Sequence, residues 1–389
     1  MREYNDLLGF QRIISIIFLI FILISTSFTN TLVTLPKSLN TLITVLLFLL
    51  YLIITFSSSY NLKNFIEQIV FLVIAVFSYI LTGASVFSIL LLSVNVLRNL
   101  QIKEILRYYF YIRLLVIVVI VLLSIMGIID NNYVVISKAG LYRVSRYAFG
   151  YAHPNQLAQA LGSLLLAYYS MNYSRKLDYS SIITYSIVSI TIYQLTLSRA
   201  FLIISILFII FNFILNIKVV GHTKEVGIPI LRYSELWIGV ALFLGLLLPY
   251  FMTIQVGELR FILYKINDLL SSRLTFSASV MENYPLSLFG TTFSFDKLGL
   301  IYGKFAVDVG YINLLYSFGL VPFLAFIITT NIVCKKLFEL NFYFLLLVFY
   351  LMLLWASMEN IIVNCSVDFV ILLFGSILFN QKSNKVEMI

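Results

Sequence analysis

Long apolar runs, separated by short polar segments, are the feature that most constrains what this chain can fold into. A helix needs roughly 20 apolar residues to cross the hydrocarbon core of a bilayer, and runs close to that length recur along the whole sequence. Of the 389 residues, 61% are hydrophobic and 11% are charged. A soluble domain of this size could not bury so much apolar surface in one core. The chain is therefore predicted to be an integral membrane protein.

About twelve spans follow from these runs, within a single polytopic domain, residues 1–389. The candidates are Ile13–Phe28, Leu39–Phe56, Ile66–Leu81, Ser85–Val96, Tyr109–Ile129, Pro154–Tyr169, Ile182–Leu197, Phe201–Ile217, Leu236–Met252, Val309–Ile328, Phe342–Trp355 and Val367–Phe379. Several are short, so we expect their helices to extend into the flanking polar residues. Because backbone groups must be paired internally within lipid, we expect helices rather than strands. The predicted fold class is an all-α polytopic membrane protein.

The positions of lysine and arginine predict the orientation. Loops on the cytoplasmic side are enriched in these residues, and an N-terminus in the cytoplasm places most of the 26 Lys and Arg residues inside, Arg113 among them. Both termini are then cytoplasmic, and the longest polar segments, 130–153 and 253–308, lie outside. The positive residues are spread over short loops, so the net charge of +9 does not indicate nucleic-acid binding.

Some cations are nevertheless expected on the outer face. Arg146 lies in the shorter outer segment, Arg273 in the longer one, and Arg199 at a tight turn between two spans. Because outer cations run against the orientation bias, they indicate a site for an anionic ligand. The alternative is that a long segment is translocated whatever its charge.

The long outer segment also contains a helical pattern. Its apolar residues recur at helical spacing between charged ones and are Leu259, Ile262, Leu263, Ile266, Leu269, Leu270 and Leu274. This pattern predicts an amphipathic helix at the membrane surface. Pro285 and Gly290 are expected to end it and to open a turn.

The run Arg146-Tyr-Ala-Phe-Gly150-Tyr-Ala-His153-Pro154-Asn155 is the strongest local motif. Gly150 permits an unusual backbone turn, and Pro154 suits the first turn of the helix that follows. An imidazole and a guanidinium are thereby placed beside a helix N-terminus, which favours anions. The alternative is a structural helix start in which His153 only satisfies backbone groups.

This run resembles a motif of the bacterial Wzy-type polymerases of capsular polysaccharide and O-antigen. Further stretches agree in order with that family. Leu197-Ser198-Arg199 is similar to its turn between two spans, and Arg273 with Asn283-Tyr-Pro285 and Leu288-Phe-Gly290 is similar to its large-loop pattern. Asp308-Val-Gly310-Tyr311 is similar to the start of the next span. The chain departs from the Arg-x10-Gly spacing described for some members.

The resemblance implies a GT-C-like glycosyltransferase that moves one polyprenyl-diphosphate-linked chain onto another lipid-linked repeat unit. Arg146, Arg199 and Arg273 would bind the diphosphate, because guanidinium groups grip phosphate oxygens bidentately. His153 would be the base or orienting group for the acceptor hydroxyl, with Asp308 as its rival. Asp308 could equally be a helix cap. The supporting motif residues are Gly150, Pro154, Asn155, Ser198, Gly290 and Tyr311.

No cofactor and no metal are expected at the reaction centre, because the chain has two histidines and His222 is predicted on the cytoplasmic side. The expected location is the bacterial cytoplasmic membrane, and the expected partners are membrane lipids, lipid-linked oligosaccharides, a flippase and a chain-length regulator. One alternative is a glycan ligase, which would carry a histidine in its large outer loop; residues 253–308 contain none. The other is a transporter or flippase, which would have functional charges near the bilayer midplane.

Overall fold

The structure is a computed structural model that describes residues 2–33, 35–57, 62–83, 85–131, 133–138, 142–171, 178–216, 228–254, 257–290 and 307–379. His222 and much of the second half of the long outer segment lie outside these ranges. Of the residues that the structure describes, 79% are helical. Among them, five helices are long and apolar enough to cross a membrane, and four shorter helices are also apolar. A mostly helical membrane protein is therefore confirmed.

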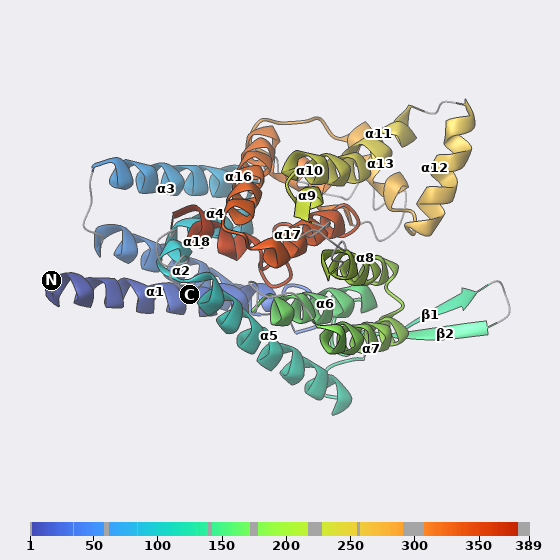
Figure 1. The fold of residues 1–389 in the computed structure, drawn as a ribbon, viewed down its shortest axis with the longest axis horizontal. Helices are drawn as coiled ribbons and strands as arrows, with labels where there is room; N and C mark the ends of the chain where they lie inside the picture. Colours follow the sequence, from blue (N-terminus) through green and yellow to red (C-terminus); the bar gives the residue numbers. More distant parts are fainter. Residues whose placement is uncertain are drawn as a thin grey trace, which may run out of the picture.

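The first helices occupy one side of the molecule, where α1, α2 and α3 run along its long axis (Figure 1). They are α1 (Arg2–Ser27), α2 (Lys37–Ser57), α3 (Leu62–Thr82), α4 (Ser85–Val96) and α5 (Ile102–Ile125). Gly83 has a φ of +65°, a conformation that glycine adopts without strain. The chain turns back there, and α4 packs against α3.

Three helices of similar length follow, packed against one another in sequence order. They are α6 (Pro154–Ser170), α7 (Tyr179–Thr196) and α8 (Arg199–Asn216). Next come the short α9 (Ile228–Leu231) and a continuous helical stretch made of α10 (Ser234–Leu242), η2 (Phe243–Leu247) and α11 (Leu248–Thr253). The turn between α7 and α8 is tight because Leu197 is left-handed, with a φ of +48°.

Helix α17 (Tyr343–Ala356) lies in the middle of the bundle (Figure 1). Every residue from Phe344 to Ala356 is buried. It packs against α8, α10 and α16 (Leu320–Glu339), and Trp237 stacks on Tyr350 with ring centroids 5.0 Å apart. A helix that is apolar on all sides is typical of a buried position, so α17 is surrounded by protein rather than by lipid.

Two expected spans are wrong in detail. The helix expected over 309–328 is divided into α15 (Gly310–Asn313), η3 (Leu314–Phe318) and, after Gly319, α16. The span expected over 367–379 contains only η4 (Ile371–Leu373) and α18 (Phe374–Phe379). Residues 357–370 before it are irregular and mostly buried, and we call them the buried segment. Irregular backbone is tolerated in such apolar surroundings where protein covers it.

The break at Gly319 depends on a second glycine. Gly319 has a φ of +96° and Gly290 a φ of +90°. A Cβ atom on Gly290 would lie 2.4 Å from the carbonyl oxygen of Ser317, and one on Gly319 would lie 2.4 Å from the backbone nitrogen of Gly290. The turn expected at Gly290 is therefore present, and its glycine is required by a close backbone approach.

Segment 130–153, which was expected outside, contains an antiparallel hairpin that was not expected. Strands β1 (Tyr133–Lys138) and β2 (Tyr142–Tyr147) pair from Tyr133 opposite Tyr147 to Lys138 opposite Tyr142. The hairpin is a small addition to a fold that agrees with the all-α expectation, and its first strand is rich in valine, isoleucine and tyrosine, the residue types that favour strands. Figure 1 shows the hairpin projecting from the helical bundle.

The described part of segment 253–308, which was expected outside, contains two helices where one amphipathic helix was expected. They are α12 (Gly257–Leu269) and α13 (Arg273–Asn283). Ser271 and Ser272 separate them, both with left-handed backbone conformations, so Leu274 belongs to the second helix. Figure 1 shows α12 running across the direction of α1–α3. Its Phe261 and Ile262 side chains are exposed.

Candidate functional site

The segment that links β2 to α6 is held by the connection between α1 and α2. The amide of Leu32 donates to the carbonyl oxygen of Gly150 at 2.9 Å, and the amide of Ala152 donates to the carbonyl oxygen of Asn30 at 3.1 Å. Gly150 has a φ of +81°. A Cβ atom there would lie 2.9 Å from Cγ2 of Ile120. The unusual turn expected at Gly150 is confirmed, and it presents the next residues to the start of α6.

His153 is the N-cap of α6, and Pro154 is the first residue of the helix, as expected. Nδ1 of His153 accepts a hydrogen bond from the amide of Asn155 at 3.1 Å. In a neutral imidazole whose Nδ1 is an acceptor, the proton is on Nε2. Burial lowers the pKa of His153, and the charge of Arg146 lowers it further, so the ring is neutral at pH 7. His153 therefore presents a donor, which suits an orienting group better than a base.

Arg146 is buried at the end of β2 and connects three elements. Its Nε donates to the carbonyl oxygen of Thr196, at the end of α7, at 2.7 Å. Its Nη2 donates to Oδ1 of Asn155 at 2.5 Å. Both acceptors are uncharged, so these bonds fix the guanidinium without neutralising it. The role of Asn155 in the sequence motif is therefore to position Arg146 through this hydrogen bond.

Arg199 is the first residue of α8 and is exposed. Its Nη1 donates to the carbonyl oxygen of Asp268, near the end of α12, at 3.1 Å. Ser198 before it is buried, and its carbonyl oxygen accepts the amide of Leu202 at 3.1 Å. The turn thus directs Arg199 toward the end of α12, while Ser198 helps to form the first turn of α8.

Arg273 lies between two carboxylates. Its Nη2 is 2.6 Å from Oε1 of Glu359, and its Nε is 3.6 Å from Oδ2 of Asp308. The other carboxylate oxygen of Glu359 accepts a hydrogen bond from Nε2 of Gln159 at 2.9 Å. Glu359 is 3% exposed, and burial raises its pKa to about 7, against the opposing effect of Arg273. Arg273 Nε has no hydrogen-bond partner among the described residues.

Asp308 is the accessible carboxylate of this group. Its side chain is 42% exposed. It does not cap the following helix, because the N-cap of α15 is Val309 and no side chain caps that helix. The helix-cap alternative for Asp308 is therefore wrong. An accessible carboxylate beside a guanidinium can accept a proton from a ligand.

These groups form one cluster, which we call the arginine cluster: Arg146, Arg199, Arg273, His153, Asp308, Glu359 and Gln159. Arg146 acts electrostatically on Arg273 and Arg199, and His153 lies within range of Arg146, Arg273 and Asp308. Three guanidinium groups face two carboxylates, so the cluster can hold an anion. Glu359 and Gln159 were not among the site residues expected from the sequence. Glu359 had one signal, an acidic residue directly after an apolar run.

Tyr311, a motif residue expected near the site, lies outside the arginine cluster. Tyr311 is fully buried, donates to the carbonyl oxygen of Leu353 at 2.9 Å, and packs against Gly245, so it supports the fold. Among the described residues, no group of three His, Cys, Asp or Glu residues could hold a metal ion.

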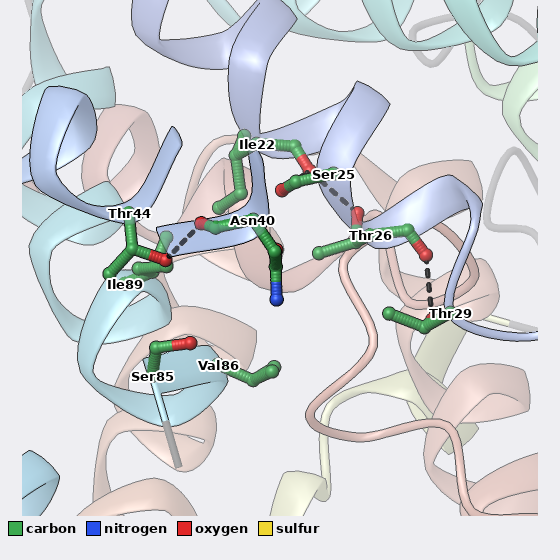
Figure 2. Close-up of a pocket in the computed structure, with 9 residues that line it drawn as sticks. All are labelled: Ile22, Ser25, Thr26, Thr29, Asn40, Thr44, Ser85, Val86 and Ile89. Atoms are coloured by element: carbon green, nitrogen blue, oxygen red, sulfur yellow. Dashed lines mark hydrogen bonds between the residues drawn. The ribbon is translucent and has the colours of Figure 1, made fainter. Parts of the chain in front are cut away.

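A small cavity is lined by the end of α1 and the starts of α2 and α4 (Figure 2). Its volume is about 40 Å³, enough for a few water molecules and too small for a sugar ring. Its polar lining consists of hydroxyl groups and the amide of Asn40, and it includes no residue of the arginine cluster.

No family model, curated protein or solved structure matches this chain.

Proposed function

We propose that this protein is a polysaccharide polymerase that joins polyprenyl-diphosphate-linked oligosaccharide units. The observation that carries the proposal is the arginine cluster: Arg146 from β2 and Arg273 from α13 lie within electrostatic range of His153, Arg273 is paired with Asp308, and Arg199 from α8 lies within electrostatic range of Arg146. A diphosphate is the kind of ligand that several guanidinium groups hold well. The resemblance of the same residues to the Wzy-type family supports the same substrate class.

The arginines differ in how they would meet a diphosphate. Arg146 is fixed by uncharged acceptors, so its charge is available to the leaving group. Arg273 shares its charge with Glu359 and Asp308, but its buried Nε offers a donor to a phosphate oxygen. His153 adds an Nε2 donor. As the bond to the sugar breaks, charge builds up on the diphosphate, and preorganised donors stabilise this charge.

The proposed reaction is a single displacement at the anomeric carbon of the donor glycan. The acceptor hydroxyl oxygen forms the new glycosidic bond, the bond from C1 to the diphosphate oxygen breaks, and polyprenyl diphosphate leaves. Asp308 takes the hydroxyl proton, because it is the accessible carboxylate and His153 presents a donor instead. Glu359 is buried and holds both Arg273 and Gln159, so its part is to position Arg273.

The proposal also includes the number of spans, their orientation and the side of the membrane on which the site lies. We expect about twelve spans in a GT-C-like arrangement, both termini in the cytoplasm, and the arginine cluster at the outer face of the bacterial cytoplasmic membrane. Helix α12 supports this placement, because it lies across the direction of α1–α3 (Figure 1) and its Phe261 and Ile262 side chains are exposed. Such a helix suits the membrane surface, and Arg199 contacts its end. A flippase and a chain-length regulator remain the expected partners.

The test is a deletion of the gene in its host, complemented with wild type, Arg199→Gln or Lys265→Gln. The length distribution of lipid-linked and surface glycan is measured, and blots confirm equal amounts of protein in the membrane. Arg199 and Lys265 are both exposed cations of this region, but only Arg199 belongs to the cluster. We expect single repeat units in the deletion and in Arg199→Gln, and long chains with wild type and Lys265→Gln.

Other results would lead to other functions. Full-length polymer that stays on its lipid carrier in the deletion would replace the proposal with a ligase. Repeat units trapped on the cytoplasmic side would replace it with a flippase. Equal chain lengths in Arg199→Gln and Lys265→Gln would remove Arg199 from the site.

A further inference from the structure

A polar stripe runs along α15 and η3, shortly after Asp308 in the chain. From Val309 to Gly319 every residue is buried except Asn313 and Ser317, which are half-buried. These two residues lie four positions apart, so their side chains share one face. Oγ of Ser317 donates to Oδ1 of Asn313 at 2.8 Å. The accessible face of this otherwise buried helical stretch is therefore polar.

Asn360 extends the stripe onto the buried segment. Nδ2 of Asn313 donates to Oδ1 of Asn360 at 3.0 Å. Asn360 is half-buried and directly follows Glu359, the carboxylate that holds Arg273. We call Asn313, Ser317 and Asn360 the amide strip. It joins two elements that are 47 residues apart in sequence.

The backbone fixes the amide strip beside the arginine cluster. Gly310 packs against the start of the buried segment, because a Cβ atom there would lie 3.1 Å from the carbonyl oxygen of Glu359. The amide of Asn313 donates to the carbonyl oxygen of Val309 at 3.0 Å, so Asn313 lies one helical turn after the residue that follows Asp308. The strip thus adjoins the cluster along both chain segments, through Asp308 on one and Glu359 on the other.

The chemistry of the strip indicates what it binds. Lipid cannot satisfy hydrogen-bonding groups, so an accessible polar strip in a membrane protein faces water or a polar ligand. The strip is uncharged, unlike the arginines, and does not suit a diphosphate. Each carboxamide has two N–H groups and two lone pairs, and a serine hydroxyl both donates and accepts. The two bonds within the strip use only part of this capacity. Sugar hydroxyl groups, which also donate and accept, match the remainder.

We propose that the amide strip is the subsite that binds the acceptor sugar, through hydroxyl groups near the one that reacts. This role rests on the proposed function, in which the arginines hold the diphosphate of the donor and Asp308 takes the acceptor proton. The donor and the acceptor then meet different surfaces: charged groups for the donor diphosphate, and uncharged amides for the acceptor sugar. The bonds among Asn313, Ser317 and Asn360 preorganise the strip, which lowers the cost of binding.

An oligosaccharide without its diphosphate separates sugar binding from diphosphate binding. The probe is the repeat-unit oligosaccharide that mild acid releases from the lipid carrier of the host, labelled at its reducing end with 2-aminobenzamide. Its dissociation constant is measured by fluorescence anisotropy with the purified full-length protein in detergent. The probe has no leaving group, so it can be extended as an acceptor but cannot serve as a donor. Its extension by unlabelled lipid-linked units is measured separately.

Three variants of the strip are compared with one control. Asn313→Ala and Asn360→Ala are each expected to raise the dissociation constant about 3- to 10-fold, because each removes neutral hydrogen bonds to the sugar. Ser317→Ala removes one hydroxyl group and is expected to raise it about threefold. Asn331→Ala is the matched control, since Asn331 is also half-buried and bonded to a serine hydroxyl, that of Ser234, but on α16 and α10. It is expected to bind as wild type does.

A second control separates the strip from the cations. Arg199→Gln is expected to bind the probe as wild type does and to lose its extension, because Arg199 acts on the diphosphate of the donor. In the strip variants, the probe concentration for half-maximal extension should rise by the same factor as the dissociation constant. Thermal unfolding of each variant confirms its fold. If an asparagine variant is unfolded, Ser317→Ala, the smallest change, decides.

The outcomes are distinct. Equal dissociation constants in the strip variants and in Asn331→Ala would overturn the subsite, and so would a wild type that does not bind the probe. Strip-dependent binding without extension, in a protein that polymerises lipid-linked units, would overturn the assignment to the acceptor. If wild type binds the probe through the strip but polymerises nothing, the proposed function fails while the sugar subsite stands.

Discussion

Arg146 and Arg273 are both buried, but their surroundings neutralise them differently. Arg146 is fixed by a backbone carbonyl and by the amide oxygen of Asn155. Arg273 is held between the carboxylates of Glu359 and Asp308. Uncharged acceptors orient a guanidinium and leave its field for a ligand, whereas carboxylates hold it by cancelling its charge. We therefore expect Arg146 to matter most for the reaction and the Arg273–Glu359 pair to matter most for stability.

The largest effect is expected from Glu359→Leu. It leaves Arg273 buried beside only the more distant Asp308, and loss of one partner of a buried pair costs about 3–5 kcal/mol of unfolding free energy. The measurement is the thermal unfolding of the detergent-solubilised protein. The double variant Glu359→Leu/Arg273→Met should recover most of that loss. Equal stability of Glu359→Leu and wild type would contradict the structural role of the pair.

The next effect concerns Arg146→Met. It removes donors aimed at the developing negative charge, so the rate of polymer formation should fall by about 10²- to 10³-fold. The rate is measured with purified protein and a lipid-diphosphate-linked oligosaccharide, and thermal unfolding is measured in parallel. Arg146→Lys keeps a charge without the two-point attachment and should lie between wild type and Arg146→Met. A large loss of stability with a normal rate in Arg146→Met would show that Arg146 matters for stability rather than for the reaction.

Asp308→Asn distinguishes the two carboxylates of Arg273. Loss of a general base lowers the rate by about 10²-fold or more, while binding of the lipid diphosphate should be unchanged because Arg146 and Arg199 remain. Single-turnover rates and direct binding separate these two effects. Asp308 is partly exposed, so its removal should change stability far less than removal of Glu359. A normal single-turnover rate in Asp308→Asn would transfer the role of base to another group.

The last effect is a dependence of stability on pH. Burial raises the pKa of Glu359 to about 7 in the folded protein, against 4.5 for an unperturbed glutamate. The folded state therefore binds the proton more tightly, and stability falls as the pH rises from about 4.5 to about 7. Thermal unfolding of wild type across this range should show the fall, and Glu359→Gln should lose this contribution. An identical pH profile in the two proteins would place the ionisation elsewhere.

Much of the local structure could be predicted from sequence. Gly150 was expected at a turn and has a left-handed backbone, and Pro154 was expected in the first turn of a helix and begins α6. The tight turn expected at Arg199 is also present, with Leu197 in a left-handed conformation. These features depend on a few neighbouring residues, whose backbone preferences act over short distances. Hydropathy likewise identified the apolar helices, because burial of apolar surface is roughly additive along the chain.

The tertiary structure alone decided which apolar segments cross the bundle and which charges meet. Hydropathy reports that a residue avoids water, but it cannot say whether lipid or protein covers it. For that reason α17 and residues 367–370, the end of the irregular buried segment, both looked like parts of spans. Glu359 meets Arg273 across 86 residues of sequence and Gln159 across 200. Such contacts depend on helix packing, so no local pattern could place Glu359 in the arginine cluster.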